Sequence, residues 1–293
     1  MTMDLKWIQT FVHAAAHENF RRTSEELFIS QPTVTIQIKQ LEQYLGSPLF
    51  KRVGRRVELT EEGRRFLPHA KHLLSVHEEG LQELHRFKQG YTRRLNLAVS
   101  PLVAAYLIPH VLNRYVHANP DVEVQVQVLE SKQIADAVLQ DQVDLGLSRM
   151  WASDARLTCD ILGEDEVVLV APHDGHDAET ASPLQLGDLL ANHMLLTYNH
   201  PEYWEPLMQE LQTRYRYIRT MLVTQVHVTK RFIEEGLGIS FLPEITIRRE
   251  RTEGRLLQVD CSELMLPTAR TYAVMKHNVT EGQRFLEFFR GFM

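Results

Sequence analysis

Residues 20–60 constrain the fold of this chain more than any other segment. They read FRRTSEELFISQPTVTIQIKQLEQYLGSPLFKRVGRRVELT, which predicts a helix, a short turn, a second helix and then a basic ribbon. Ser30 is a favourable N-cap, and Pro32 suits a first helical turn because its missing N–H is not needed there. Gly46 is typical of the residue that ends a helix. This order predicts a winged helix-turn-helix head, which is a DNA-binding fold.

Apolar residues at helical spacing predict the core of this head. A helix over residues 3–17 has one apolar face, and the helix that follows Ser30 has an inward stripe that runs to about Leu45. At the end of the helix between them, Leu27 and Phe28 are expected to turn inward. The other expected core residues are Leu5, Ile8, Phe11, Val12, Ala15, Val34, Ile38 and Leu41.

The outward face of the last helix is polar and has no acidic residue between Gln31 and Gln40. Glutamine and threonine can hydrogen-bond base edges in the major groove, and a helix N-terminus attracts phosphate. A merely solvated face is the alternative, but surface helices usually mix glutamate with lysine. We therefore predict DNA contacts along this face, which presents Gln31, Thr33, Thr35, Gln37, Lys39 and Gln40.

A basic ribbon over residues 51–59 follows this helix directly. Gly54 allows a tight turn between two short strands. Arg52, Arg55 and Arg56 would then lie on a protruding wing that reaches phosphate or the minor groove. A basic turn alone is weak evidence, because most such turns are only solvated. The prediction rests on the position of this turn directly after the helix.

Charge and cysteine content limit the remaining possibilities. The formal net charge is −6, and residues 1–92 contain 13 Lys and Arg against 11 Asp and Glu, whereas the remainder contains 19 against 27. The acidic part should therefore stay off DNA. Cys159 and Cys261 match no zinc or redox spacing, which favours a reducing compartment without a metal site or cofactor. We find no signal core or long apolar run, and we expect a soluble cytoplasmic protein that does not bind membranes.

Residues 60–89 predict one long helix capped by Thr60. Apolar residues recur in alternating steps of three and four and form a heptad seam, which favours pairing with a second subunit. The alternative is that the seam packs on the C-terminal part of the same chain. The residues predicted to make the dimer contact are Leu67, Leu74, Leu81 and Leu84.

The rest of the chain alternates strands and helices. Strands over 95–99, 122–129 and 144–148 with intervening helices predict a parallel sheet, and a second set includes strands over 167–171 and 239–242. The expected architecture is an α+β, multi-domain chain with three parts. These are a head over 1–60, a linker helix over 61–90 and a two-lobed α/β effector domain over 91–293, in which lobe I covers about 91–163 and 268–293 and lobe II covers about 164–267.

Two α/β lobes form a cleft, and the loops at the carboxyl ends of their strands point into it. Ser100 and Thr197 could donate hydroxyl groups there, and Arg149 could form a fork for a carboxylate. Each could instead be a structural cap or a surface charge, and His200, His227 and Lys230 are weaker candidates. The predicted effector contacts are Ser100, Pro101, Leu102, Glu130, Ser148, Arg149, Thr197, Tyr198, Asn199 and Gln225.

Three ordered motifs carry a resemblance to a known family. SQPTVT, LEQYLGSPLFKRVGRR and LTEEG are similar to the head of the LysR-type transcriptional regulators, and the likeness covers the full chain. It implies paired winged heads on an interrupted inverted repeat of double-stranded DNA, usually in a dimer of dimers that bends the site. It also implies a small-molecule effector, with Ser100 at the start of the pocket. The implied DNA contacts are Gln31, Pro32, Thr33, Thr35, Gln37, Lys39, Arg52 and Arg55.

The head departs from the family pattern at two places. Thr35 stands where serine is common, and its hydroxyl is retained. Thr23-Ser24 stand where two alanines are common, which questions how tightly the head packs.

Within the family, LHRFKQGY, VSPL, NHPEYW and TQVHVTKRFIEEGLGISFLP resemble Bacillus-type members that repress a minor citrate synthase gene. The expected function is therefore repression of such a gene under the control of an effector, which we predict to be a carboxylate. The alternatives are an activator or dual regulator of another metabolic operon, a solute-binding protein, or an enzyme. We find no G-x-S-x-G, P-loop, G-x-G-x-x-G or H-E-x-x-H motif and predict no catalytic residue.

Overall fold

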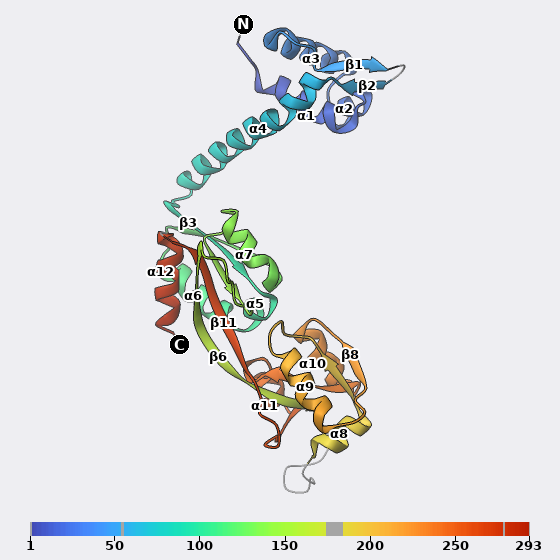
Figure 1. Cartoon of the computed structure of the whole chain (residues 1–293). Helices are drawn as coiled ribbons and strands as arrows, with labels where there is room; N and C mark the ends of the chain where they lie inside the picture. The colour runs from blue at the N-terminus through green and yellow to red at the C-terminus, as the bar shows by residue number, and fades with distance from the viewer. Residues whose placement is uncertain (1, 54–55, 174–183, 278, 293) are drawn as a thin grey trace. The chain divides into compact units, whose positions relative to one another are not determined.

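The computed structural model describes residues 2–53, 56–173, 184–277 and 279–292. The chain forms two compact units, Met1–Gly90 and Tyr91–Met293, and Figure 1 labels most of their helices and several of their strands. No helix within the described ranges is long and apolar enough to cross a membrane.

The first unit contains a winged head and a long helix. Its elements are α1 (Leu5–His17), α2 (Phe20–Glu26), α3 (Gln31–Leu45), β1 (Phe50–Val53), β2 (Arg56–Leu59) and α4 (Glu61–Lys88).

Side-chain caps set the helix boundaries of the head. The Asn19 side chain accepts from the backbone N–H groups of Arg21 and Arg22, and Ser30 Oγ accepts from Thr33 N at 3.3 Å. Gly46 ends α3 with a φ of 69°, in the left-handed region that glycine adopts easily. Each cap removes a backbone donor or acceptor that the helix itself cannot satisfy.

The head buries most of its predicted apolar residues but not all of them. Leu5 is 37% exposed at the first position of α1, and Phe28 is 95% exposed. The prediction for Phe28 was wrong because its φ of 53° reverses the chain after α2. Ile29 packs against the core instead. The buried set is Ile8, Phe11, Ala14, Val34, Ile38, Leu41, Leu49, Leu59 and Ala70.

Thr23 and Ser24 fit the packed head in place of the two alanines. Both are buried. Thr23 Oγ1 donates to the carbonyl oxygen of Asn19 at 2.9 Å, and Ser24 Oγ donates to that of Arg21 at 2.7 Å. Because each hydroxyl is satisfied inside α2, it needs no partner in the core.

Helix α4 begins in contact with the head. Phe66, Leu67 and Leu74 pack against the head core around the buried Ala70. A Cβ atom on Gly63 would lie 2.3 Å from the Leu49 carbonyl oxygen, so only glycine allows this approach. Part of the predicted seam therefore packs on its own head.

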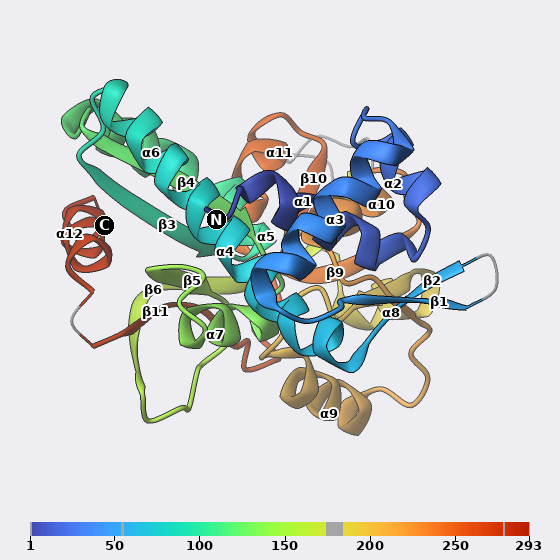
Figure 2. The ribbon, with the colours of Figure 1, turned by 90° about the horizontal axis from the view of Figure 1, so that it is seen from above.

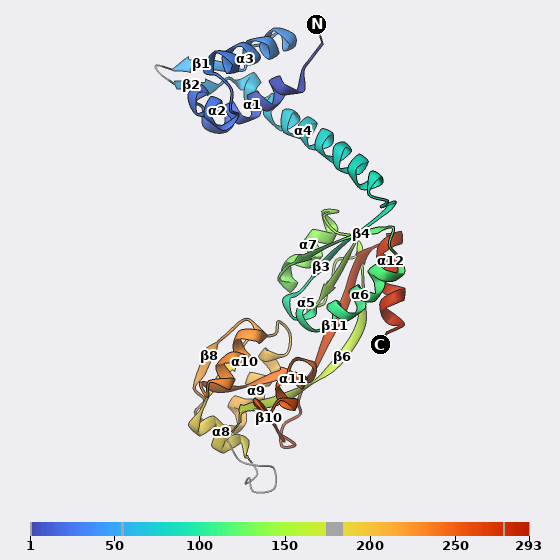
Figure 3. The same cartoon turned by 180° about the vertical axis from the view of Figure 1, so that it is seen from behind.

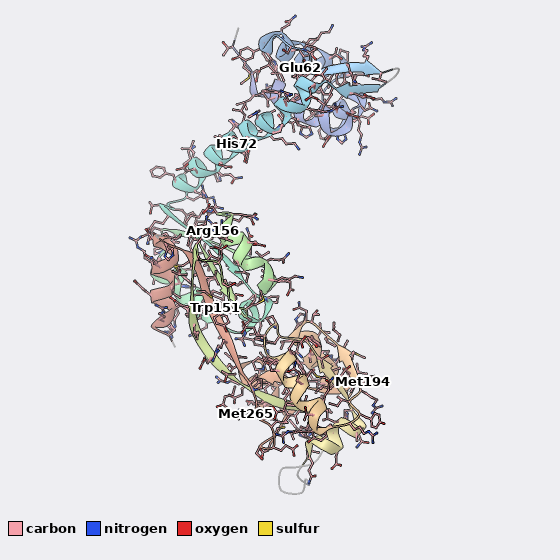
Figure 4. All side chains as sticks on the ribbon, in the orientation of Figure 1. Glu62, His72, Trp151, Arg156, Met194 and Met265 are labelled. Carbon is pink, nitrogen blue, oxygen red and sulfur yellow. The ribbon has the colours of Figure 1, made fainter. Side chains whose placement is uncertain are left out.

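The remainder of α4, on which Figure 4 labels His72, keeps an exposed apolar surface. Its exposed residues are Leu73, Val76, Leu81, Leu84 and Phe87. The head does not cover these side chains.

The second unit contains one sheet and the helices that cover it. Its strands are β3 (Arg93–Val99), β4 (Val122–Val128), β5 (Leu145–Ser148), β6 (Leu157–Pro172), β7 (Met194–Thr197), β8 (Thr220–Leu222), β9 (Gly238–Pro243), β10 (Leu256–Val259) and β11 (Thr268–Lys276). Its helices are α5 (Pro101–Tyr106), α6 (Ile108–Ala118), α7 (Ser131–Leu139), α8 (Leu186–Asn192), α9 (Trp204–Arg214), α10 (Val226–Glu234), η1 (Glu244–Thr246), α11 (Arg248–Thr252) and α12 (Thr280–Arg290).

The strand order is β4-β3-β5-β11-β6-β9-β7-β8, with β10 paired to β6. Strands β3, β4 and β5 are parallel, as predicted, and so are β7, β8 and β9. The long strands β6 and β11 pair antiparallel between the two sets. All carboxyl ends within a parallel set share one edge, which gathers the following loops.

Helices cover both faces of each set. In lobe I, α6 and α12 pack on one face and α7 packs on the other (Figure 3). In lobe II, α8 and α9 pack on one face and α10 on the other.

The tight approach at Gly63 predicts a stability effect. We expect Gly63→Ala to destabilise the head by about 1–3 kcal/mol, because the added methyl group meets backbone. Gly80 has open space around its Cβ direction, so Gly80→Ala is the matched control and should stabilise α4 by about 1 kcal/mol. Calorimetric unfolding of the full chain would measure both, and equal behaviour of the two variants would contradict the packing described.

Candidate nucleic-acid interface and effector cavity

The outward face of α3 combines free polar groups with one apolar side chain. Gln31 and Lys39 are exposed, and Ile36 is 55% exposed between them. Thr35 Oγ1 donates to the Gln31 carbonyl oxygen at 3.2 Å, and Thr33 Oγ1 shares a 2.7 Å hydrogen bond with Ser30 Oγ. These local bonds hold both hydroxyl groups against the start of α3.

Gln37 differs from the other residues of this face because a neighbour holds it. The hydroxyl of the buried Thr10 on α1 donates to Gln37 Oε1 at 2.5 Å. The amide N–H groups of Gln37 are then directed away from that bond. In this orientation Gln37 offers donors, which suits acceptor atoms on base edges.

Glu42 explains why the acid-free face ends where it does. Its Oε1 accepts from Leu49 N at 2.7 Å and from Phe50 N at 3.1 Å. The Glu42 carboxylate, the first in α3, therefore binds backbone N–H groups at the start of β1. It fixes β1 relative to α3 and keeps its negative charge on the wing side.

The wing is a two-stranded ribbon that extends away from the helices (Figure 2). Val53 pairs with Arg56, and Arg52 on β1 is exposed. The prediction for Arg55 lies outside the described residues, and only the backbone of Arg56 is described. Of the three predicted wing arginines, Arg52 is therefore the one whose side chain can be placed.

A cavity of about 520 Å³ opens between the loops that follow the strands of the second unit. It is lined by most of the predicted effector contacts, together with residues that the sequence did not single out. The predicted lining residues are Ser100, Pro101, Leu102, Glu130, Arg149, Tyr198, Asn199 and Gln225. The unforeseen ones include Ala105, Tyr106, Lys132 and Met150.

Ser148 and Thr197 do not line this cavity. Thr197 Oγ1 donates to the Met221 carbonyl oxygen at 3.3 Å, and Ser148 Oγ accepts from Met150 N at 3.0 Å. Each is the last residue of its strand, and each hydroxyl is used within the framework. Lys230 is likewise structural, because its Nζ donates to Glu250 Oε1 at 2.5 Å and to the Thr246 carbonyl oxygen at 2.7 Å.

Asn199 lines the cavity, but its amide is already engaged. Its Nδ2 donates to Ser240 Oγ at 2.9 Å, and its Oδ1 accepts from Trp204 Nε1 at 3.1 Å. These bonds hold the loop after β7 in place. The spacing of Asn199 and Tyr203 could have indicated this role, because residues four positions apart lie on one side of a helical turn.

Two buried polar atoms in the cavity walls lack a hydrogen-bond partner among the described residues. They are Ser100 Oγ and Arg149 Nη2, and both residues are only 2% exposed. An unsatisfied buried group costs about 1–3 kcal/mol. An oxygen acceptor within hydrogen-bond distance of either atom would remove that penalty.

The rest of the Arg149 guanidinium is fixed. Nη1 donates to Thr271 Oγ1 at 2.6 Å, and Nε lies 3.1 Å from His200 Nε2. Burial, and then the charge of Arg149, hold the pKa of His200 well below its ordinary value, so the ring is neutral. A fixed cation beside a neutral ring favours an anion in the cavity.

Comparisons with known proteins agree with this architecture. Residues 5–64 match the family described as "Bacterial regulatory helix-turn-helix protein, lysR family", and residues 88–292 match "LysR substrate binding domain". The chain is a LysR-type transcriptional regulator. The family binds DNA to control transcription and is not a family of enzymes, and this regulator couples such a head to an effector-binding domain.

Individual relatives cover the regulator from end to end. It is 44% identical to the HTH-type transcriptional regulator CitR of Bacillus subtilis over 290 residues, which is 99% of each chain. It is 37% identical to the uncharacterized HTH-type regulator YxjO of the same organism, over 99% of this chain and 98% of the other.

Solved structures show the same fold at lower identity. Full-length CbnR complexed with its target DNA has a TM-score of 0.66 at 17% identity and 99% coverage of both chains. Vibrio fischeri DarR in complex with DNA has a TM-score of 0.69 at 18% identity and full coverage.

The head geometry predicts two separable mutational effects in this LysR-type regulator. Arg52→Ala should weaken binding to every duplex and lower the slope of log affinity against log salt by about 0.9 per arginine lost, because phosphate contacts release counterions. Gln31→Ala should cost about 1–3 kcal/mol on the operator alone. Gel shifts over a salt series would measure both.

Arg156→Ala in the second unit is the control for charge removal and should change neither quantity. If Arg52→Ala and Gln31→Ala lower specific and random binding alike, the division between phosphate and base contacts is wrong.

Proposed function

We propose that this LysR-type regulator represses a citrate synthase gene and that a carboxylate metabolite in the cavity controls it. The observation that carries the proposal is the 44% identity to CitR across 99% of both chains. The narrower likeness found in the sequence supports it, because VSPL, NHPEYW and the stretch that begins TQVHV supply much of the cavity lining.

A carboxylate fits the groups that the cavity leaves unsatisfied. Its two oxygens could accept from Ser100 Oγ and Arg149 Nη2, and charge-assisted hydrogen bonds are the stronger kind. Lys132 adds a second cation to the lining. Glu130 is the acidic lining residue, and its Oε1 already accepts from Gln225 Nε2 at 2.8 Å.

The neutral His200 strengthens this choice of ligand. Its two ring nitrogens both face N–H donors, Arg149 Nε at 3.1 Å and Glu202 N at 3.2 Å. A neutral imidazole has one acceptor nitrogen, so it satisfies only one of these donors. A ligand oxygen near Arg149 would supply the missing acceptor.

The DNA-reading set proposed for the head is Gln31, Pro32, Thr33, Thr35, Gln37, Lys39, Arg52, Arg55 and Arg56. Paired heads would read an interrupted inverted repeat. We propose that the exposed apolar part of α4, with Leu81 and Leu84, makes the dimer contact, to which Leu67 and Leu74 contribute where they emerge from the head. A dimer of dimers could then respond to a change in lobe closure by altering the spacing of its heads.

The operator test uses the purified full chain on DNA fragments. We expect protection of two half-sites upstream of a citrate synthase gene, and a rise in its transcript when the regulator is deleted. A fall in that transcript would favour an activator instead. Protection of other promoters only would assign the regulator to a different operon.

The effector test uses calorimetry with citrate and related di- and tricarboxylates. We expect Ser100→Ala to weaken binding by about tenfold, which corresponds to about 1.4 kcal/mol. The same change should not destabilise the fold, because Ser100 Oγ has no partner to lose among the described residues.

Thr197→Val is the matched control, since that hydroxyl lies outside the cavity lining, and it should leave affinity unchanged. Failure of all these acids to bind the wild-type protein would remove the carboxylate from the proposal.

A further inference from the structure

The motif NHPEYW over residues 199–204 is anchored firmly in lobe II. Asn199 bonds Ser240 and Trp204, as described above, and Tyr203 Oη donates to the Phe241 carbonyl oxygen at 2.9 Å. Tyr203 and Trp204 are 3% and 1% exposed. The chain between these anchors is therefore held rigidly by the lobe II core.

The carboxylate of Glu202, within this motif, accepts hydrogen bonds from lobe I. Glu202 Oε1 accepts from Trp151 N at 2.8 Å, and Glu202 Oε2 accepts from Tyr272 Oη at 3.0 Å. Trp151 follows β5, and Tyr272 lies on β11 where it pairs with β5. Both oxygens of a single side chain thus bridge the two lobes.

The lobe I segment that binds Glu202 is residues 149–151. Three successive backbone N–H groups follow β5. Arg149 N donates to Ser131 Oγ at 3.2 Å and Met150 N donates to Ser148 Oγ at 3.0 Å, both within lobe I. Among the described residues, the third, Trp151 N, finds its acceptor on Glu202 in lobe II.

Glu202 is close to the cavity but is not part of its lining, whereas His200 and Pro201 are. A ligand in the cavity would therefore contact the neighbours of Glu202 without displacing its carboxylate. Two further interlobe contacts join lining residues and are open to disturbance by a ligand: Gln225 Nε2 to Glu130 Oε1 at 2.8 Å, and Arg149 Nε to His200 Nε2 at 3.1 Å.

We infer that Glu202 is a positioning residue for the effector response: its carboxylate holds lobe I and lobe II at a fixed closure around the cavity through Trp151 N and Tyr272 Oη. The inference rests on the proposed effector function of the cavity. Glu202 would then set the closure of the two lobes in the absence of ligand, although it does not line the cavity.

Trp151 gives a direct readout of this bridge. Trp151, labelled in Figure 4, is 50% exposed, and its ring packs edge-on against that of Tyr272 at 5.5 Å between centroids. Trp204 is 1% exposed, so quencher acting on this unit reports chiefly on Trp151. Trp151→Phe identifies the Trp151 part of the emission.

The experiment measures iodide quenching of the full chain in four variants. Glu202→Ala should increase the quenching constant of Trp151 and shift its emission to longer wavelength, and Tyr272→Phe should do so to a smaller extent. Glu202→Gln should restore wild-type values, because its amide can accept from Trp151 N and donate to Tyr272 Oη. Glu205→Ala removes an exposed carboxylate on α9 and is the control, with no expected change.

Effector binding gives the second readout. Loss of two interlobe hydrogen bonds should weaken the binding of citrate or another bound acid by about tenfold in Glu202→Ala, and not in Glu202→Gln. Unchanged Trp151 quenching in Glu202→Ala overturns the inference. If no acid binds the wild-type protein, the carboxylate proposal fails alone, because quenching still decides the role of Glu202.

Discussion

The antiparallel pairing of β6 with β11 is the interaction on which the effector unit depends. It runs from Leu157 opposite Lys276 to Glu166 opposite Thr268 and joins two parallel sets of strands into one sheet. Because each parallel set adds to an opposite side of this pair, the loops of lobe I and lobe II meet at one cavity. The fixed position of Arg149 between His200 and Thr271 follows from the same arrangement.

The polar residues in and around the cavity are of two kinds. Ser100 and Arg149, which line the cavity, each have a buried polar atom without a partner among the described residues, whereas Asn199, Ser148 and Thr197 use their polar groups to hold the loops. A binding site needs both kinds, since buried ligand contacts are effective only on a rigid frame. The proposed role of Glu202 extends this frame across the lobes.

Sequence patterns predicted the head well because its boundaries are local. Asn19, Ser30 and Gly46 cap or end their helices through bonds to residues two to four positions away. The prediction that Phe28 turns inward failed, because an apolar residue gives no sign that its backbone is left-handed. In the second unit, the strand expected over 167–171 extends over Leu157–Pro172, since pairing with β11 stabilises its polar first half.

The amino-acid sequence by itself determined the helix-turn-helix, the strands of the two parallel sets and the set of loops at the cavity, because these depend on local capping, on periodicity and on the rule that strand ends gather at one edge. It did not indicate β10 or β11, whose polar and apolar residues do not follow a clear pattern. The tertiary structure alone decided which side chains in those loops face the ligand. Ser148 and Thr197 turn to the framework, while Tyr106 and Lys132 join the lining. The reason is that the direction of a side chain at a strand end depends on partners far away in the chain, and no local pattern records them.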